Sequence, residues 1–178
     1  MSKTNEFRII SQEEKLRDKD HVETPKWVVQ DMYKRININK YKNIWLPFNH
    51  LESEFRQEAL ANKLHYDATH IFDDLQNDFF RINPPDNCDL IISNPPFSIQ
   101  NKILERLFNL NIPFAMLLPL RSLETAPRGE LFEKHRNKIQ VLIFKKRIKF
   151  KGCTTSFNQG CIWLTYKLNL PGGDIQWI

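Results

Sequence analysis

The sequence lacks the spacing of cysteines that a zinc or redox site requires. Its three cysteines, Cys88, Cys153 and Cys161, stand at unrelated spacings, and no C-x-x-C pair occurs. The five histidines show no metal-ligand spacing either, so we expect no bound metal. The odd number of cysteines and the absence of a signal peptide favour a reducing compartment. We therefore expect a cytoplasmic protein.

Long apolar runs and repeats are absent as well. The longest apolar run, residues 112–120, contains two prolines and is far too short to cross a bilayer. Neither an internal repeat nor a low-complexity segment is visible. Apolar residues make up 41% of the chain, which is sufficient for a packed core. These features exclude a membrane-spanning chain and favour a folded domain.

The chain is long enough for one domain preceded by a short arm. Its 178 residues fit a single domain, which we place at residues 21–178. Residues 1–20 are polar and charged and predict a flexible or loosely docked arm. The net charge of +5 is compatible with a nucleic-acid partner, although ordinary enzymes can be equally basic.

Short apolar runs alternate with amphipathic stretches, which is typical of an α/β fold with a mostly parallel, twisted sheet and helices on both faces. The predicted strands are residues 42–46, 65–71, 88–93, 113–118, 141–144 and 160–166. The predicted helices are residues 26–35, 51–64, 99–110 and 128–135. The first should begin at a capping Thr24 followed by Pro25. In the second, Phe55, Leu60 and Leu64 should lie on or near one face.

Such sheets bind their ligands outside the carboxyl ends of the parallel strands. In this chain, the predicted strand ends carry Pro47-Phe48, Thr69-His70, Asn94-Pro95-Pro96-Phe97 and Leu120-Arg121. We therefore expect these four segments to converge at one end of the sheet.

The turn Asn94-Pro95-Pro96-Phe97 carries the groups that could hold an aromatic amine. Prolines fix the backbone and remove two amide donors, so the nearby carbonyl oxygens remain as acceptors. The side chain of Asn94 adds an acceptor, and Phe97 offers a flat face on which a base can stack. An ordinary turn with Phe97 in the core would use the same residues.

The segment from Asp89 to Phe97, D-L-I-I-S-N-P-P-F, resembles motif IV of the S-adenosyl-L-methionine (AdoMet)-dependent methyltransferases that modify adenine in DNA. The resemblance implies a Rossmann-like class I methyltransferase fold. It also implies that Asn94 and the Pro95 carbonyl accept hydrogen bonds from the target amine, with Pro96 completing the catalytic turn. Phe97 would stack on an adenine flipped out of the duplex, and Asn94 would also contact the cofactor.

Further segments follow the order of the same family over roughly residues 22–166 and look most like its short phage-type members. Thr24-Pro25 resembles the segment at the methionine end of AdoMet, and Pro47-Phe48 takes the place of motif I. Asp78-Phe79 resembles the pair that faces the adenine of the cofactor, and Phe150 resembles the aromatic residue that packs on the extruded base. The implied cofactor is AdoMet, the implied partner is adenine-containing DNA, and a phage protein would act in the host cytoplasm.

The segment in the place of motif I departs from the family pattern, because residues 46–55 contain no glycine. Glycines in this loop let the backbone approach the cofactor. Asn49 is the residue there that can best adopt a left-handed conformation. The family also has an acid after the second strand, which binds the ribose hydroxyls. Here His70 or Asp73 falls nearest to that position.

A run of basic residues follows the strand predicted at residues 141–144. In an extended chain, one face would carry Lys145, Arg147, Lys149 and Lys151. The opposite face would carry Lys146, Ile148 and Phe150, with Phe150 toward the cleft. The basic row is a candidate for contact with nucleic-acid phosphates. A solvated edge strand protected by lysines would have the same pattern.

Three functions remain open at this point. The first is transfer of a methyl group from AdoMet to the exocyclic amine of adenine in DNA. The second is a catalytically weak or inactive protein that keeps the fold and binds nucleic acid or a host protein, which the glycine-free loop favours. The third is an RNA or protein-glutamine methyltransferase, because those enzymes also use Asn-Pro-Pro turns.

Overall fold

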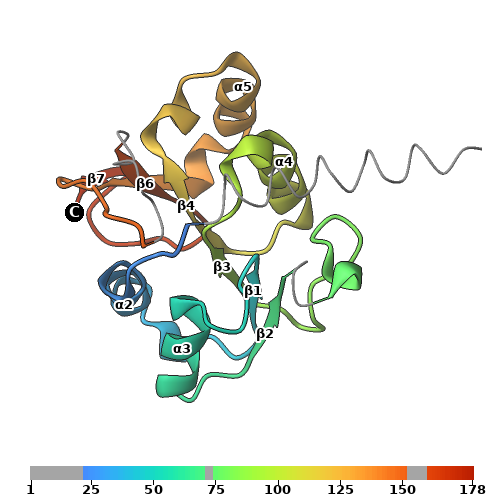
Figure 1. Ribbon diagram of the computed structural model, residues 1–178. Helices are drawn as coiled ribbons and strands as arrows, with labels where there is room; N and C mark the ends of the chain where they lie inside the picture. The colour runs from blue at the N-terminus through green and yellow to red at the C-terminus, as the bar shows by residue number, and fades with distance from the viewer. Residues whose placement is uncertain (1–21, 71–73, 152–159) are drawn as a thin grey trace, which may run out of the picture.

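A seven-stranded sheet in the order β2-β1-β3-β4-β6-β5-β7 forms the centre of the molecule (Figure 1). The computed structural model describes residues 22–70, 74–151 and 160–178, so the arm predicted at residues 1–20 lies outside the described residues. The strands are β1 (Ile44–Pro47), β2 (Tyr66–Thr69), β3 (Leu90–Ser93), β4 (Phe114–Pro119), β5 (Ile139–Ile143), β6 (Cys161–Tyr166) and β7 (Ile175–Trp177). Six of them match the predicted strands within a few residues.

Helices cover both faces of this sheet, as the amphipathic pattern predicted. The α-helices are α2 (Lys26–Arg35), α3 (Glu54–Ala61), α4 (Gln100–Leu110) and α5 (Ala126–His135). Short 3-10 helices are η1 (Ile38–Lys40), η2 (Leu75–Asn77), η3 (Phe97–Ile99), η4 (Leu120–Leu123) and η5 (Arg136–Lys138). Figure 1 shows α2 and α3 on one side of the sheet and α4 and α5 on the other. The core accordingly divides into two clusters, with Ile92 facing α2 and α3 and Ile91 facing α4 and α5.

The strand directions bring the functional loops to one end of the sheet. β2, β1, β3 and β4 are parallel neighbours, so the loops that follow them all lie at the same end, as predicted. β6 runs antiparallel to both β4 and β5, so β5 points in the same direction as β4. The loop after β5 therefore reaches this end too. We call this side the carboxyl end of the sheet.

Two elements differ from the prediction. The helix predicted at residues 51–64 is shorter and corresponds to α3. Its start is fixed by the Ser53 hydroxyl, which caps the helix by accepting a hydrogen bond from the Arg56 amide at 3.4 Å. Leu60 is 60% exposed, so its predicted place on the buried face is wrong. Strand β7 was not predicted. It has only three residues, of which Ile175 and Trp177 are exposed, and it pairs with β5 along the edge of the sheet.

The start of α2 also corrects the prediction. The helix spans Lys26–Arg35 as expected, but Pro25 occupies the N-cap position and no side chain caps the helix. Thr24 is buried one residue earlier, so its hydroxyl is not the predicted cap. The position of proline explains this, because its fixed φ suits the extended N-cap conformation found here, with φ −62° and ψ 144°.

The segment after β5 is not the regular extended strand that was predicted. Lys146 is exposed instead of facing inward, because the backbone bends at residues 145 and 146. From Arg147 to Lys151, exposed and buried side chains do alternate. The inner side chains, Ile148 and Phe150, belong to the core cluster that includes α2 residues. Phe150 is 7% exposed, which indicates a core side chain rather than an open stacking face toward a cleft.

We expect Phe150→Ala to lower the free energy of unfolding by about 3–5 kcal/mol, because a large aromatic side chain leaves the core. Lys149→Ala, a change at the exposed neighbouring residue, should alter it by less than about 0.5 kcal/mol. Equilibrium unfolding in urea compares the two variants with the wild type. Equal stability of Phe150→Ala and the wild type would mean that Phe150 does not belong to the core.

Candidate active site at the carboxyl end of the sheet

The turn after β3 contains a buried acceptor without a partner. Pro95 and Phe97 are buried, and the Oδ1 atom of Asn94 is also buried. Within the described part of the chain, Asn94 Oδ1 is the only buried side-chain oxygen that lacks a hydrogen bond. An unsatisfied buried acceptor costs about 1–3 kcal/mol, so native proteins rarely keep one without a use. The turn is therefore prepared to receive a hydrogen-bond donor.

A buried hydrogen-bond network fixes this turn to the loop after β1. The Pro47 carbonyl accepts hydrogen bonds from the Ser93 hydroxyl and from the Asn49 side-chain amide, the latter at 2.8 Å. The same amide also donates to the Ser93 Oγ atom at 2.9 Å. The Asn49 backbone amide donates to the Thr69 carbonyl at 3.2 Å. The ends of β1, β2 and β3 are thus joined directly. Sequence reasoning did not find Ser93, which looked like part of a strand.

The loop after β1 turns without glycine by an arrangement that differs from the expected one. Phe48, and not Asn49, has the left-handed conformation, with φ at 63°. Its ring packs against Phe79 at 4.7 Å between centroids, and Phe79 stacks on Trp45 at 5.3 Å. The structure therefore brings together the predicted pairs Pro47-Phe48 and Asp78-Phe79. The side chains of Phe48 and Asn49 are both engaged inside the protein, which keeps them from filling the loop.

The loop that contains Asp78 and Phe79 is held by local contacts. Phe79 is only 4% exposed, so most of its ring faces the core. Asp78 accepts a hydrogen bond from the Phe80 amide at 2.9 Å and pairs with Arg81 at 3.3 Å. Arg106, on α4, lies over the Phe79 ring at 5.2 Å and donates to the Phe80 carbonyl at 3.1 Å. These contacts fix the loop beside the end of β1.

Two histidines meet where β1 and β2 end. The rings of His50 and His70 lie 5.8 Å apart in an edge-to-face arrangement. The Nδ1 atom of His50 accepts a hydrogen bond from the Glu52 amide at 3.2 Å. His70 was predicted as a site residue, whereas His50 was not, because the residues reveal their contact only once the strands are paired. Asp73, the other candidate at this position, lies outside the described residues.

Contacts of Lys151 place the segment Thr24-Pro25 near the same end of the sheet. Glu23 and Lys151 exchange two backbone hydrogen bonds, at 3.2 and 3.1 Å. The ammonium group of Lys151 pairs with Glu54, the first residue of α3, at 2.8 Å. Since α3 follows the loop after β1, these contacts place the start of α2 beside that loop. They also assign Lys151 to an ion pair and not to a free basic row.

A second polar cluster fixes the helix that follows the Asn94 turn. Ser122, after β4, donates a hydrogen bond to the Oε1 atom of Gln100 at 2.6 Å. The buried guanidinium of Arg128 donates to the Ser122 carbonyl at 2.5 Å and to Asn101 Oδ1 at 2.6 Å. None of these residues was predicted, because polar residues far apart in the sequence give no pattern. They position α4, and with it the turn, against the end of β4.

Burial keeps both cysteines in the described part of the chain protonated. Burial raises the pKa of the Cys161 thiol to about 12 and that of the Cys88 thiol to about 11, so both are protonated at neutral pH. Cys153 lies outside the described residues.

Within residues 22–70, 74–151 and 160–178, no group of three or more His, Cys, Asp or Glu residues is arranged to hold a metal. No helix in those residues is long and apolar enough to span a bilayer.

Comparisons with solved structures identify the fold. A protein from Listeria monocytogenes, assigned as a class I S-adenosylmethionine-dependent methyltransferase, superposes with a TM-score of 0.53 and 13% identity, covering 87% of this chain and 64% of that chain. A modification subunit assigned to a type I restriction enzyme of Vibrio vulnificus YJ016 superposes with a TM-score of 0.55 and 12% identity, covering 94% of this chain and 51% of that chain. The chain has the class I methyltransferase fold.

The likeness concerns architecture and not sequence. No family model matches the chain, and no curated protein matches it. The chain spans 64% and 51% of the lengths of the two solved proteins. The class I methyltransferase fold agrees with the fold that the residues around Asn94 predicted.

The left-handed conformation of Phe48 predicts that glycine is more stable than alanine at this position, the reverse of their order in a helix. Phe48→Gly should be about 1 kcal/mol more stable than Phe48→Ala, because both lose the ring but only glycine relieves the backbone strain. At Glu105, an exposed position inside α4, the alanine variant should instead be the more stable by about 1 kcal/mol. Urea unfolding of the four variants measures both differences. The same order at both positions would rule out a left-handed residue 48.

Proposed function

We propose that this protein transfers a methyl group from AdoMet to the exocyclic amine of adenine in DNA. The observation that carries the proposal is the buried, unpartnered Oδ1 atom of Asn94 in a Pro-Pro turn at the carboxyl end of a class I methyltransferase fold. An amine with two hydrogens supplies the donor that this oxygen lacks. The Vibrio vulnificus protein of the same fold is assigned as a modification subunit of a restriction enzyme, which supports a DNA substrate.

The chemistry of the turn follows from its acceptors. Asn94 Oδ1 and the Pro95 carbonyl would each accept one hydrogen of the amine, which orients the nitrogen lone pair and stabilises positive charge as the new bond forms. Pro96 keeps the turn rigid and contributes no competing N–H donor. Phe97 is 8% exposed but, unlike Phe150, belongs to neither core cluster, so we keep it as the residue that would stack on the base. A base that is paired in a duplex must first be flipped out to reach the turn. AdoMet, when bound, supplies the electrophilic methyl group.

The residues around the turn fit a bound AdoMet. Phe48 packs on Phe79 and Asn49 bonds to Pro47 and Ser93, and these contacts support the loop after Pro47 where the family pattern has glycines. We assign Thr24, Pro25, Pro47, Phe48, His70, Asp78, Phe79 and Asn94 to the cofactor side of the site. Phe79 would mainly support Phe48 and not contact the cofactor directly, because the Phe48 ring packs on it. His70 would replace the usual acid as a hydrogen-bonding group toward the ribose.

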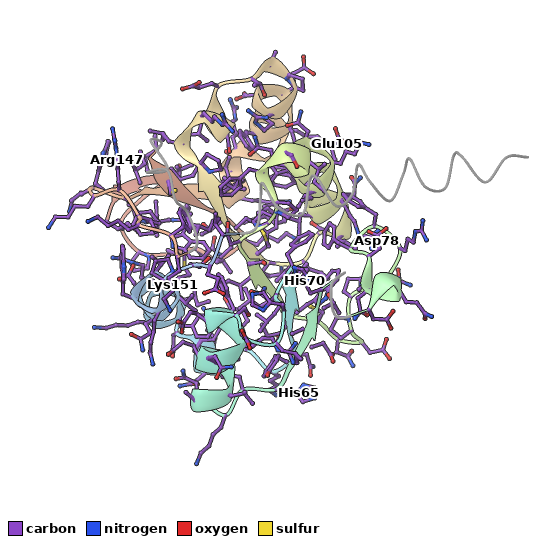
Figure 2. All side chains as sticks on the ribbon, in the orientation of Figure 1. His65, His70, Asp78, Glu105, Arg147 and Lys151 are labelled. Carbon is purple, nitrogen blue, oxygen red and sulfur yellow. The ribbon has the colours of Figure 1, made fainter. Side chains whose placement is uncertain are left out.

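Exposed cations after β5 support a nucleic-acid substrate. Lys145, Arg147 and Lys149 are exposed, and no ion pair among the described residues includes them. We propose that these three residues bind the DNA backbone, whereas Lys151 is neutralised by Glu54. In Figure 2, Arg147 lies on the opposite side of the molecule from Asp78, so the phosphate contacts are separate from the cofactor loop.

The first test of this function removes the unpartnered acceptor. Asn94→Ala should abolish methyl transfer to adenine-containing DNA and weaken AdoMet binding only slightly, because Asn94 is one of eight residues assigned to the cofactor side. Its free energy of unfolding should equal or exceed that of the wild type, because no native hydrogen bond of Oδ1 is lost. Asn39→Ala, at an exposed residue of η1, is the matched control.

The assay follows radioactive methyl transfer, with calorimetric titration of AdoMet in parallel. Wild-type transfer rates in Asn94→Ala would contradict the catalytic role of Asn94. AdoMet binding by the wild type without transfer to any adenine-containing DNA would favour a non-catalytic protein of the same fold. Transfer to RNA or to a protein amide in place of DNA would change the substrate.

The second test changes the cations after β5. Replacing Lys145, Arg147 and Lys149 by glutamine should weaken DNA binding about equally for all sequences and reduce the slope of log affinity against log salt by about 2–3. AdoMet affinity should not change. A control variant with Lys63, Lys102 and Lys134 replaced by glutamine carries the same net charge. Equal salt slopes in the two triple variants would exclude a specific role for this segment.

A further inference from the structure

Trp27 is an exposed aromatic residue at the start of α2 that the proposed reaction does not use. Its side chain is 51% exposed, although tryptophan is usually buried. The ring is held in place by Phe144, with centroids 5.8 Å apart and planes at 84°. Edge-to-face packing of this kind supports the tryptophan from one side. A rigid, exposed aromatic surface is therefore present near the carboxyl end of the sheet.

The basic segment contacts the start of α2 at both of its ends. Phe144, which contacts Trp27, immediately precedes Lys145. At the other end of the segment, Lys151 is paired with Glu23 through two backbone hydrogen bonds. Both ends of residues 144–151 thus contact residues 23–27, and we call the segment between these contacts the basic arc. Figure 2 shows Arg147 at the outer margin of the molecule and Lys151 beside α2.

Buried side chains fix this arc, and its charge is not compensated locally. Ile148 and Phe150 anchor it in the core cluster that also contains residues of α2. The segment contains no acidic residue, and its exposed cations outside ion pairs are Lys145, Lys146, Arg147 and Lys149. Two nearby acids are already paired, since Glu54 binds Lys151 and Glu58 binds Lys26 at 3.1 Å, which leaves Glu23 as the nearby acid without an ion pair among the described residues. The surface around Trp27 is therefore both aromatic and strongly cationic.

We propose that Trp27 and the basic arc bind a single-stranded stretch of DNA, with one unpaired base stacked on Trp27 and the neighbouring phosphates on the cations. This rests on the proposed function and specifies the form of its DNA substrate. Base faces are hidden inside a duplex but are available in a single strand, where an aromatic side chain can stack on any base. The cations track the backbone and do not read sequence. Binding is consequently stronger for single-stranded than for duplex DNA of equal length.

The test measures binding of a fluorescent thymidine oligonucleotide without AdoMet, and compares it with a duplex of the same length. Because thymidine contains no target adenine, the measurement is independent of methyl transfer. Trp27→Ala should weaken single-strand binding about tenfold and leave the salt slope unchanged, because stacking releases no counterions. Trp27→Phe should restore most of the affinity. Leu60→Ala removes another exposed apolar side chain, near the end of α3 that lies away from the Glu54–Lys151 pair, and should have no effect.

A fluorescence measurement provides a second, structural readout. Trp45 and Trp163 are fully buried, so Trp27 should dominate the response to a bound strand in a Trp177→Phe background. Binding should quench that emission. Wild-type affinity in Trp27→Ala, a duplex preference in the wild type or an absence of quenching would each overturn the stacking site. Each of these results would leave the proposal of methyl transfer at Asn94 intact. Conversely, loss of transfer in Asn94→Ala with unchanged single-strand binding would leave the proposed stacking site intact.

Discussion

The carbonyl oxygen of Pro47 is the acceptor on which the geometry of the site depends. It receives two buried hydrogen bonds, from the Ser93 hydroxyl and from the Asn49 amide. One donor ends the strand that precedes Asn94, and the other begins the turn after β1. Hydrogen bonds in a dry interior are strong, and breaking one leaves an unsatisfied buried group. A single peptide oxygen therefore joins the loop after β1 to the turn that contains Asn94.

This constraint also explains why the loop tolerates an unfavourable backbone. A left-handed phenylalanine is expected to cost about 1–2 kcal/mol. At Phe48 the contact with Phe79 offsets that cost, because the ring lies on an aromatic stack that continues to Trp45. Glycine would adopt this conformation without strain. Here the loop has a phenylalanine instead, so its shape depends on the aromatic packing beneath it.

The sequence predicted those parts of the protein that rest on local pattern or on topology. Six strands, a mostly parallel sheet and the meeting of four strand ends followed from apolar runs and turn residues, and the Asn94 turn followed from its own chemistry. What failed depends on tertiary contacts. Alternation around Phe150 looks the same whether the inner face meets the core or a cleft, and only packing distinguishes the two. The pair His50–His70 and the Asn49 network join loops that are distant in sequence, so no spacing could reveal them.

The first turn of α2 has contacts in two directions. Thr24-Pro25 lies toward the proposed cofactor side, whereas Trp27 lies toward the basic arc, and the backbone pairing of Glu23 with Lys151 joins the arc to the same turn. A ligand that orders this turn from one side reduces the conformational freedom that the other ligand must remove. Such coupling is reciprocal by thermodynamic necessity. We therefore expect AdoMet and a single strand to favour each other's binding, which would let the protein engage DNA most strongly when the methyl donor is in place.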